Sequence, residues 1–105
     1  MKLPFLILIS SVISFSALAQ SQIRLKGRVV DSENKALSFA YVTLQGVALG
    51  TVTDGDGDFA VNIPAEHVDK SIAFSYLGYE PQVHAISALQ KMSPLVVRLD
   101  KDVTL

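Results

Sequence analysis

The chain has 105 residues, half of them hydrophobic, no cysteine and a formal net charge of −1. This charge argues against the strongly basic surface with which proteins bind nucleic acid. The absence of cysteine excludes disulfides and a lipid-attachment site, which requires one. We therefore expect one small domain whose stability comes from a hydrophobic core.

The first 19 residues have the pattern of a secretory signal peptide. Lys2 supplies a positive charge, residues 3–15 form an apolar stretch interrupted by serines, and Ala17-Leu18-Ala19 provides small residues for a signal peptidase. A retained anchor is the alternative, but a spanning helix needs about 20 predominantly apolar residues. We expect a signal peptide over residues 1–19, a domain over residues 20–105, no transmembrane helix after cleavage, and a location in the periplasm, outer membrane or cell surface.

The rest of the chain is expected to form short strands separated by turns. Apolar and polar residues alternate from Ile23 to Val29, which predicts a half-buried strand. Its polar side carries Arg24, Lys26 and Arg28, which we interpret as a solvated face, with a membrane- or polyanion-binding stripe as the alternative. Further strands are predicted over residues 39–44, 51–53, 59–63, 71–77, 80–86 and 95–99, and residues 87–92 fit either a helical turn or a loop.

Short strands about ten residues apart, without a long segment of helical periodicity, are typical of an antiparallel β-sandwich. The predicted fold class is all-β, with seven antiparallel strands, and a small barrel is the alternative architecture.

The segment Asp54-Gly55-Asp56-Gly57-Asp58 is the first candidate for a ligand site. Its three carboxylates at alternate positions could offer oxygen ligands to calcium. The twelve-residue calcium loop also needs glycine at its sixth position and glutamate at its twelfth, where this chain has Phe59 and Ala65. We interpret the segment as a tight hairpin turn and keep a weak calcium site, held by Asp54, Asp56 and Asp58, as the alternative.

Residues for catalysis are not assembled by any recognisable motif. The two histidines, His67 and His84, are far apart in sequence, whereas zinc motifs place ligands at short fixed spacings. No G-x-S-x-G motif marks a nucleophilic serine, and no glycine-rich loop precedes a predicted helix. We expect no enzymatic activity, no catalytic residue and no cofactor.

Aromatic residues suggest a second kind of site, a surface on which sugars or peptides could stack. Most of the tyrosines and phenylalanines alternate into predicted strands, where packing inside the sandwich is their ordinary role. Tyr41 and Tyr79 are the best candidates for an exposed aromatic face.

Three segments resemble a known family in the correct order. Lys26 to Asp31 (KGRVVD), followed by Ala36-Leu37 and Ala40 to Leu44, resembles the G-x-V-x-D … P-L-x-G-A-x-V opening of carboxypeptidase regulatory-like domains. Gly50 to Asp54 with Gly57-Asp58-Phe59 is similar to the family's G-T-x-T-D-x-x-G-x-F element, and Phe74 to Glu80 is similar to F-S-Y-V-G-Y. The chain departs from the pattern at Ala36, where many members have proline, and at Ser38, where they have glycine.

The resemblance implies a transthyretin-like (prealbumin-like) sandwich that acts as an accessory unit without catalysis. Such domains occur beside metallocarboxypeptidase domains and at the N-terminus of TonB-dependent outer-membrane receptors of Bacteroidetes. The motif residues implied to be structural are Gly27, Thr53, Asp54, Gly57, Phe59, Tyr76, Gly78 and Tyr79. Thr53 and Asp54 would start a turn, Gly57 would permit its backbone, Phe59 would fill the core and Gly78 would allow a bend.

The expected function is that of a non-catalytic accessory or interaction module of the bacterial envelope. Its partner would be an unidentified envelope protein or a downstream domain, through which it could associate with the outer membrane. The chain is either a stand-alone copy or the N-terminal stretch of a larger protein. A carbohydrate- or peptide-binding module is the alternative. Transthyretin-like hydrolases of purine breakdown end in Tyr-Arg-Gly-Ser, whereas this chain ends in Lys101-Asp102-Val103-Thr104-Leu105, which argues against an enzyme.

Overall fold

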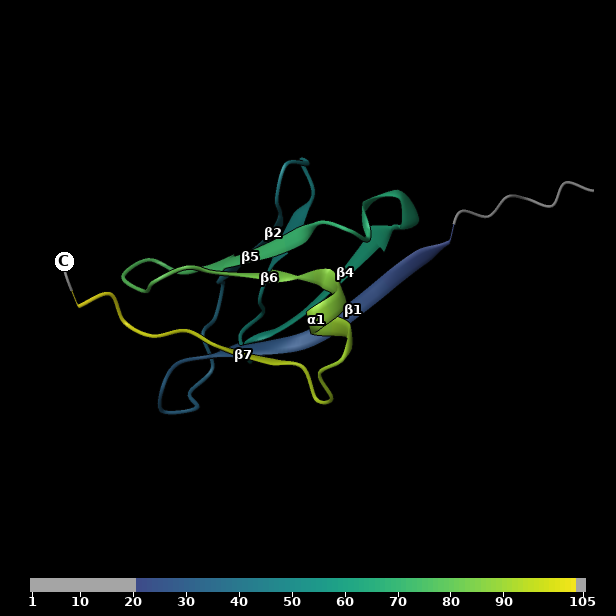
Figure 1. Ribbon diagram of the computed structural model, residues 1–105. Coiled ribbons are helices and arrows are strands. Elements are labelled where there is room, and N and C mark those ends of the chain that lie inside the picture. The colour runs from purple at the N-terminus through teal and green to yellow at the C-terminus, as the bar shows by residue number, and fades with distance from the viewer. Residues whose placement is uncertain (1–20, 104–105) are drawn as a thin grey trace, which may run out of the picture.

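Alternating burial along the strands builds two sheets that face each other. The computed structural model describes residues 21–103, and the predicted signal peptide lies outside them. One sheet has the order β4-β1-β7, formed by Asp58–Pro64, Gln22–Val30 and Val96–Arg98. The other has the order β3-β2-β5-β6, formed by Gly50–Val52, Tyr41–Leu44, Ser71–Ser75 and Gln82–Ala85 (Figure 1). The predicted all-β sandwich is confirmed.

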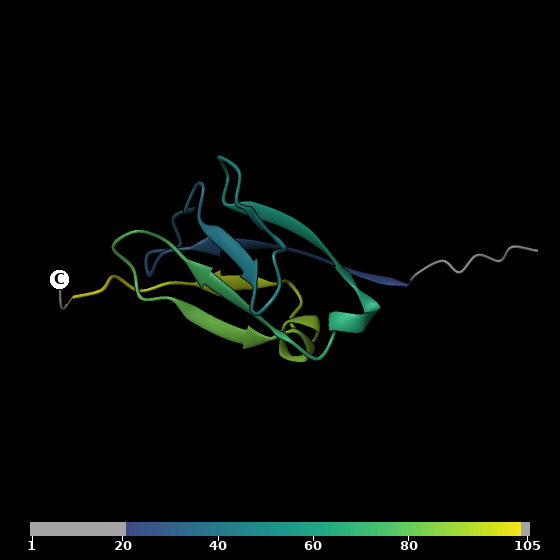
Figure 2. The same ribbon diagram turned by 90° about the horizontal axis from the view of Figure 1, so that it is seen from above.

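Two short helical segments connect strands at one end of the sandwich. The 3-10 turn η1, Ala65–His67, follows β4, and the helix α1, Ile86–Gln90, follows β6. Both lie toward the end at which β1 begins, whereas residue 103 lies at the opposite end (Figure 2). None of the helices in residues 21–103 is long and apolar enough to cross a membrane.

The strand directions differ from the prediction in one pair. β1 is antiparallel to β4 from Gln22 to Arg28, but β7 pairs with β1 in parallel over Arg28–Val30. A parallel pair needs a crossover connection, and here the strands of the second sheet and α1 come between β1 and β7 along the chain. Period-2 alternation carries no information about strand direction, so the expectation of a fully antiparallel sandwich was wrong for this pair.

The core fills the space between the sheets. Phe59 of β4 and Phe74 of β5 meet there with ring centroids 5.7 Å apart in an edge-to-face arrangement. Ile86 and Leu89 of α1 are also buried, so the helix closes the core at one end. Burial of these apolar side chains is the main source of stability in a chain without disulfides.

Two strand boundaries differ from the prediction because of backbone geometry. Phe39 was expected in a strand, but it has φ 64°, and β2 begins only at Tyr41. β5 ends at Ser75 because the Tyr79 N–H donates to the Tyr76 carbonyl oxygen at 2.9 Å, closing a turn in which Gly78 has φ 89°.

Candidate functional site

Two five-residue loops at one end of the fold share the same hydrogen-bond pattern. Oδ1 of Asp54 accepts the backbone N–H groups of Asp56 and Asp58 at 2.8 and 3.0 Å, and the fourth residue, Gly57, has φ 78°. Oδ1 of Asp31 accepts the N–H groups two and four residues later at 2.8 and 2.9 Å. In that loop the fourth residue, Asn34, has φ 65°. Each aspartate therefore organises its own turn.

The same bonds limit what the aspartate loop could offer a cation. Carboxylate oxygens of Asp54, Asp56 and Asp58 lie within 4.8 Å of one another, and all three are partly or largely exposed. One oxygen of Asp54 already accepts two backbone donors, and Oδ1 of Asp58 pairs with Nε of Arg28 at 3.1 Å. The segment thus forms the hairpin turn expected from the sequence, and the calcium site at these three aspartates stays a prediction.

The turn formed by residues 54–58 also packs closely against β1. A Cβ atom at Gly57 would lie 2.7 Å from the Val29 carbonyl oxygen, so both its φ and its surroundings favour glycine. Gly27 is similarly constrained, because a Cβ there would lie 2.7 Å from the Leu95 carbonyl oxygen. These two glycines let β1, the turn and the segment before β7 approach one another.

Thr53 is the one buried polar residue in the described part of the chain. Its hydroxyl donates to the Leu37 carbonyl oxygen at 2.6 Å and accepts the Ala40 N–H at 2.8 Å. Its carbonyl oxygen accepts the Phe39 N–H at 3.0 Å. Thr53 was expected to start a turn, and the structure gives it a second task, which is to hold residues 37–40 in place. The family resemblance marked Thr53, which directly follows β3, as structural, but alternation alone does not separate it from Thr51, two residues earlier.

This arrangement holds a bulky side chain at the surface. Phe39 is 66% exposed, and two residues later Tyr41 of β2 is 58% exposed and pairs in register with Val52 of β3, which is 44% exposed. We call Phe39, Tyr41 and Val52 the aromatic patch. A positive φ is unfavourable for phenylalanine, and its exposure was not foreseen from the sequence.

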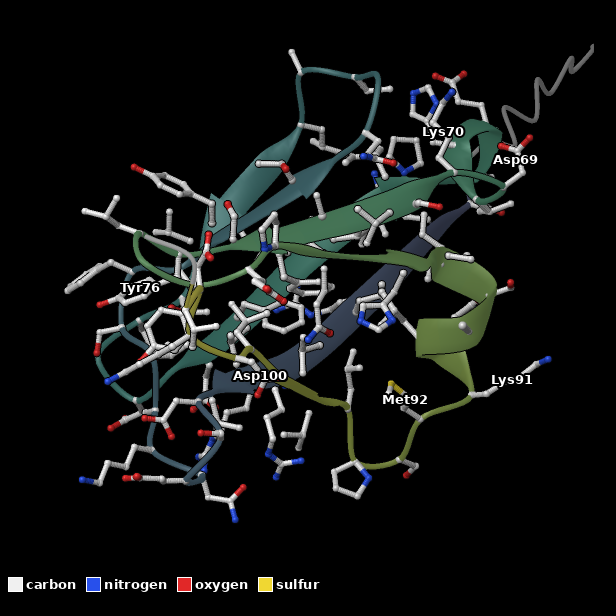
Figure 3. All side chains as sticks on the ribbon, turned by 60° about the vertical axis from the view of Figure 1, so that its left-hand side comes forward. Asp69, Lys70, Tyr76, Lys91, Met92 and Asp100 are labelled. Carbon is white, nitrogen blue, oxygen red and sulfur yellow. The ribbon has the colours of Figure 1, made fainter. Side chains whose placement is uncertain are left out.

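Tyr79, the other tyrosine expected at the surface, is half-buried. Its ring packs edge-to-face on Tyr76 with centroids 5.5 Å apart, and both tyrosines lie against the core. Tyr79 also bridges to Lys101, and the Asp102 N–H donates to the Gly78 carbonyl oxygen at 2.9 Å. Tyr76 is seen at this end of the sandwich in Figure 3. The turn containing Gly78 therefore anchors the segment that follows β7.

The histidines lie on different elements and have local partners. Nε2 of His84, on β6, lies 2.9 Å from Oε1 of Gln82, and its ring packs edge-to-face on Phe74. Nε2 of His67, in η1, lies 3.4 Å from Oε2 of Glu66. The Nδ1 atom of His67 is buried without a hydrogen-bond partner among the described residues. The group of three potential metal ligands that residues 21–103 bring together is the aspartate group, which contains no histidine.

These features define a two-sheet module with tightly ordered turns. The chain belongs to the CarboxypepD_reg-like domain family, whose model matches residues 25–105. It is 36% identical over 84 residues to the TonB-dependent receptor SusC of Bacteroides thetaiotaomicron. That match covers 79% of this chain and 8% of the receptor. The resemblance to carboxypeptidase regulatory-like domains is therefore confirmed.

Proposed function

We propose that this chain is a non-catalytic module of a TonB-dependent outer-membrane receptor and forms the receptor's N-terminal extension on the periplasmic side. The similarity to SusC over most of the described domain carries this proposal. Its expected signal peptide, over residues 1–19, agrees with a location in the envelope.

The arrangement of the ends supports a module within a longer polypeptide. β1 begins at one end of the sandwich and residue 103 lies at the other, so a segment that follows would leave the domain at the end opposite to the start of β1 (Figure 1). Backbone bonds from Glu80 to Asp100 and from Asp102 to Gly78 hold the outgoing segment on the fold, at 2.9 Å each. A domain that follows would thereby take a defined starting direction.

The mass and location of the native product test the proposal. An antiserum raised against the purified chain is used to probe periplasmic and outer-membrane fractions of the source bacterium. We expect an antigen in the outer-membrane fraction whose mass is far above the 11.3 kDa of this chain. An antigen of the chain's own size in the periplasm would contradict the receptor proposal.

The aromatic patch supports a second candidate function, binding of a carbohydrate or an apolar peptide. Exposed aromatic rings offer faces for stacking, and Phe39 is held at the surface by a backbone conformation that is costly for its residue type. Titration with a glycan panel, followed by tyrosine fluorescence, tests this function. We expect a response that is lost in Tyr41→Ala but retained in Leu77→Ala, which removes another exposed side chain. A flat response across the panel would argue against this candidate.

A further inference from the structure

The central strand β1 is longer than one of its partners. β4 pairs with β1 from Gln22 to Arg28, but β7 pairs only with Arg28–Val30. On the β7 side, residues 22–27 therefore have no neighbouring strand in the described part of the chain. Figure 1 shows β1 continuing past α1 with β7 beside only its far end.

Hydrogen bonds at the two ends of the β1–β4 pair fix the direction of the backbone groups between them. The Ala65 N–H donates to the Ser21 carbonyl oxygen at 3.1 Å, and the Val29 N–H donates to the Gly57 carbonyl oxygen at 2.8 Å. Residues of an antiparallel pair alternate between facing the partner strand and facing away from it.

By this alternation Ile23 and Leu25 bond to β4, and Arg24 and Lys26 direct their N–H and C=O groups to the other side. Arg28 shares this orientation, and its N–H donates to the Leu95 carbonyl oxygen at 3.0 Å. Within residues 21–103 no hydrogen bond reaches the main-chain groups of Arg24 and Lys26. This stretch of β1 is an unpaired strand edge.

A surface groove runs along this edge. It has a volume of about 390 Å³ and lies between β1 residues 23–26 and the segment 92–95, with Leu89 of α1 also lining it. Figure 3 shows Met92 directed back toward the sheet and Lys91 directed away from it. A second groove, of about 550 Å³, shares Lys26 and Pro94 with the first and continues toward Val96. The edge is therefore accessible to an extended chain.

The charge along the edge selects among possible occupants. Arg24 and Lys26 are exposed, and no carboxylate lines the groove beside them. Arg28 is paired with Asp58, whereas Lys26 has no ion pair among the described residues. A second copy of this strand would bring like charges together, which is unfavourable in a cross-strand pair. An acidic strand would instead place carboxylates beside Arg24 and Lys26.

We propose that the open edge of β1 binds an extended acidic peptide segment by strand addition. Main-chain groups of the segment pair with those of Arg24 and Lys26, and its carboxylates lie beside these two cationic side chains. The side chains between the carboxylates are apolar and lie against Ile23 and the groove wall formed by residues 92–95. Residues 22–27 match a segment of about six residues. This proposal does not depend on the receptor context proposed above.

A synthetic peptide tests the mode of binding. The probe is a capped heptapeptide in which aspartate or glutamate alternates with valine, titrated into the purified chain and followed by NMR of backbone amides. We expect the Arg24 and Lys26 amides to shift and to become protected from hydrogen exchange by about tenfold or more, whereas the Leu25 amide is protected before the peptide is added. A peptide of the same sequence with alternate amides N-methylated should not bind, because it cannot donate to the edge.

Charge variants test the recognition. Lys26→Glu and Arg24→Glu should each weaken binding of the acidic peptide by about tenfold. Lys35→Glu, which makes the same charge change in an exposed loop, should leave binding unchanged. The proposal is overturned if the N-methylated or a lysine-containing peptide binds equally well, or if the shifts fall on the aromatic patch. Dimerisation through β1, or binding of anionic phospholipid vesicles without binding of the peptide, would also overturn it.

Discussion

Thr53 joins two segments of backbone through a single hydroxyl group. Replacing it by valine keeps the shape but removes the bonds to Leu37 and Ala40 inside a fully buried site. We expect Thr53→Val to lower the free energy of unfolding by about 2–4 kcal/mol, because a buried donor and a buried acceptor lose their partner. Chemical denaturation measures the effect. Thr51→Val, the same change at a half-buried position with only a 3.5 Å contact, should stay within about 0.5 kcal/mol of the wild type, and equal losses would refute this role of Thr53.

Asp31 makes stability depend on pH. The pKa of Asp31 is lowered from its ordinary value of 3.8, chiefly because the Lys35 N–H donates to its carboxylate. A carboxyl group whose pKa is lower in the folded state stabilises the fold above its unfolded pKa, and this contribution is lost as pH falls through the folded value. Asp31→Asn retains an acceptor oxygen but does not titrate. We expect the wild type to be the more stable of the two at pH 7 and the difference to shrink below pH 3.8 in urea titrations. A difference independent of pH would contradict this cause.

Single residues show where sequence reasoning reaches its limit. The family pattern and the alternation indicated that Phe59 fills the core and that Gly57 needs a permissive backbone, and both positions have the corresponding geometry. The positive φ of Phe39 could not be inferred, because it is imposed by hydrogen bonds to Thr53 from outside its own segment. Phenylalanine in a run of β-forming residues gives the opposite signal.

The two glycines of the Asp54–Asp58 loop differ in backbone conformation and in the space around them. Gly57 has φ 78° and a carbonyl oxygen 2.7 Å from the position of its absent Cβ, whereas a Cβ at Gly55 would meet nothing within 4 Å. Gly57→Ala should therefore cost about 2 kcal/mol or more, since an L-residue at this φ is strained and clashes. Gly55→Ala should be neutral or slightly stabilising, because it restricts only the unfolded chain. Thermal denaturation of the two variants compares them directly, and similar losses would show that the φ of Gly57 is not what matters.

The same loop should fold independently of calcium. Its backbone donors and Arg28 already occupy oxygens of Asp54 and Asp58, so we expect the same melting temperature in millimolar calcium and in chelator. A cation that binds only the folded state would raise the melting temperature with its concentration. Such a rise in the wild type, absent from Asp56→Asn, would contradict the hairpin-turn interpretation and support the calcium site.

At the scale of strands, alternation predicted the existence of the elements better than their partners. β1, β4 and β5 follow the expected apolar spacing because one face of each is buried. The parallel pairing of β7 and its short length could not be predicted, since they depend on where the chain re-enters the first sheet. Because β7 is much shorter than β1, part of β1 has an open edge. Arg24 and Lys26 lie along this edge, whereas the sequence alone places them on an ordinary solvated strand face.

The whole molecule depends on contact between the two sheets. The β4-β1-β7 sheet has a charged outer side, whereas the outer side of the other sheet carries small, polar and exposed apolar residues such as Tyr41 and Val83. Neither sheet can bury its inner side without the other, so the side chains that cross the interface couple them. Phe59 and Phe74 come from different sheets and pack edge-to-face, with both side chains buried. A double-mutant cycle with Phe59→Leu and Phe74→Leu isolates their interaction from the burial of each ring.

We expect a coupling energy of about 0.5–1.5 kcal/mol beyond the sum of the single effects, as found for aromatic pairs in this geometry. The control cycle pairs Phe74→Leu with Leu77→Ala, whose side chain is 95% exposed at a turn, and it should be additive. Urea denaturation followed by two probes also shows whether the sheets unfold together. In a sandwich joined by one core, the loss of the central contact must weaken both sheets at once. Separate unfolding transitions, or no coupling energy between the two rings, would therefore mean that the sheets are stabilised independently.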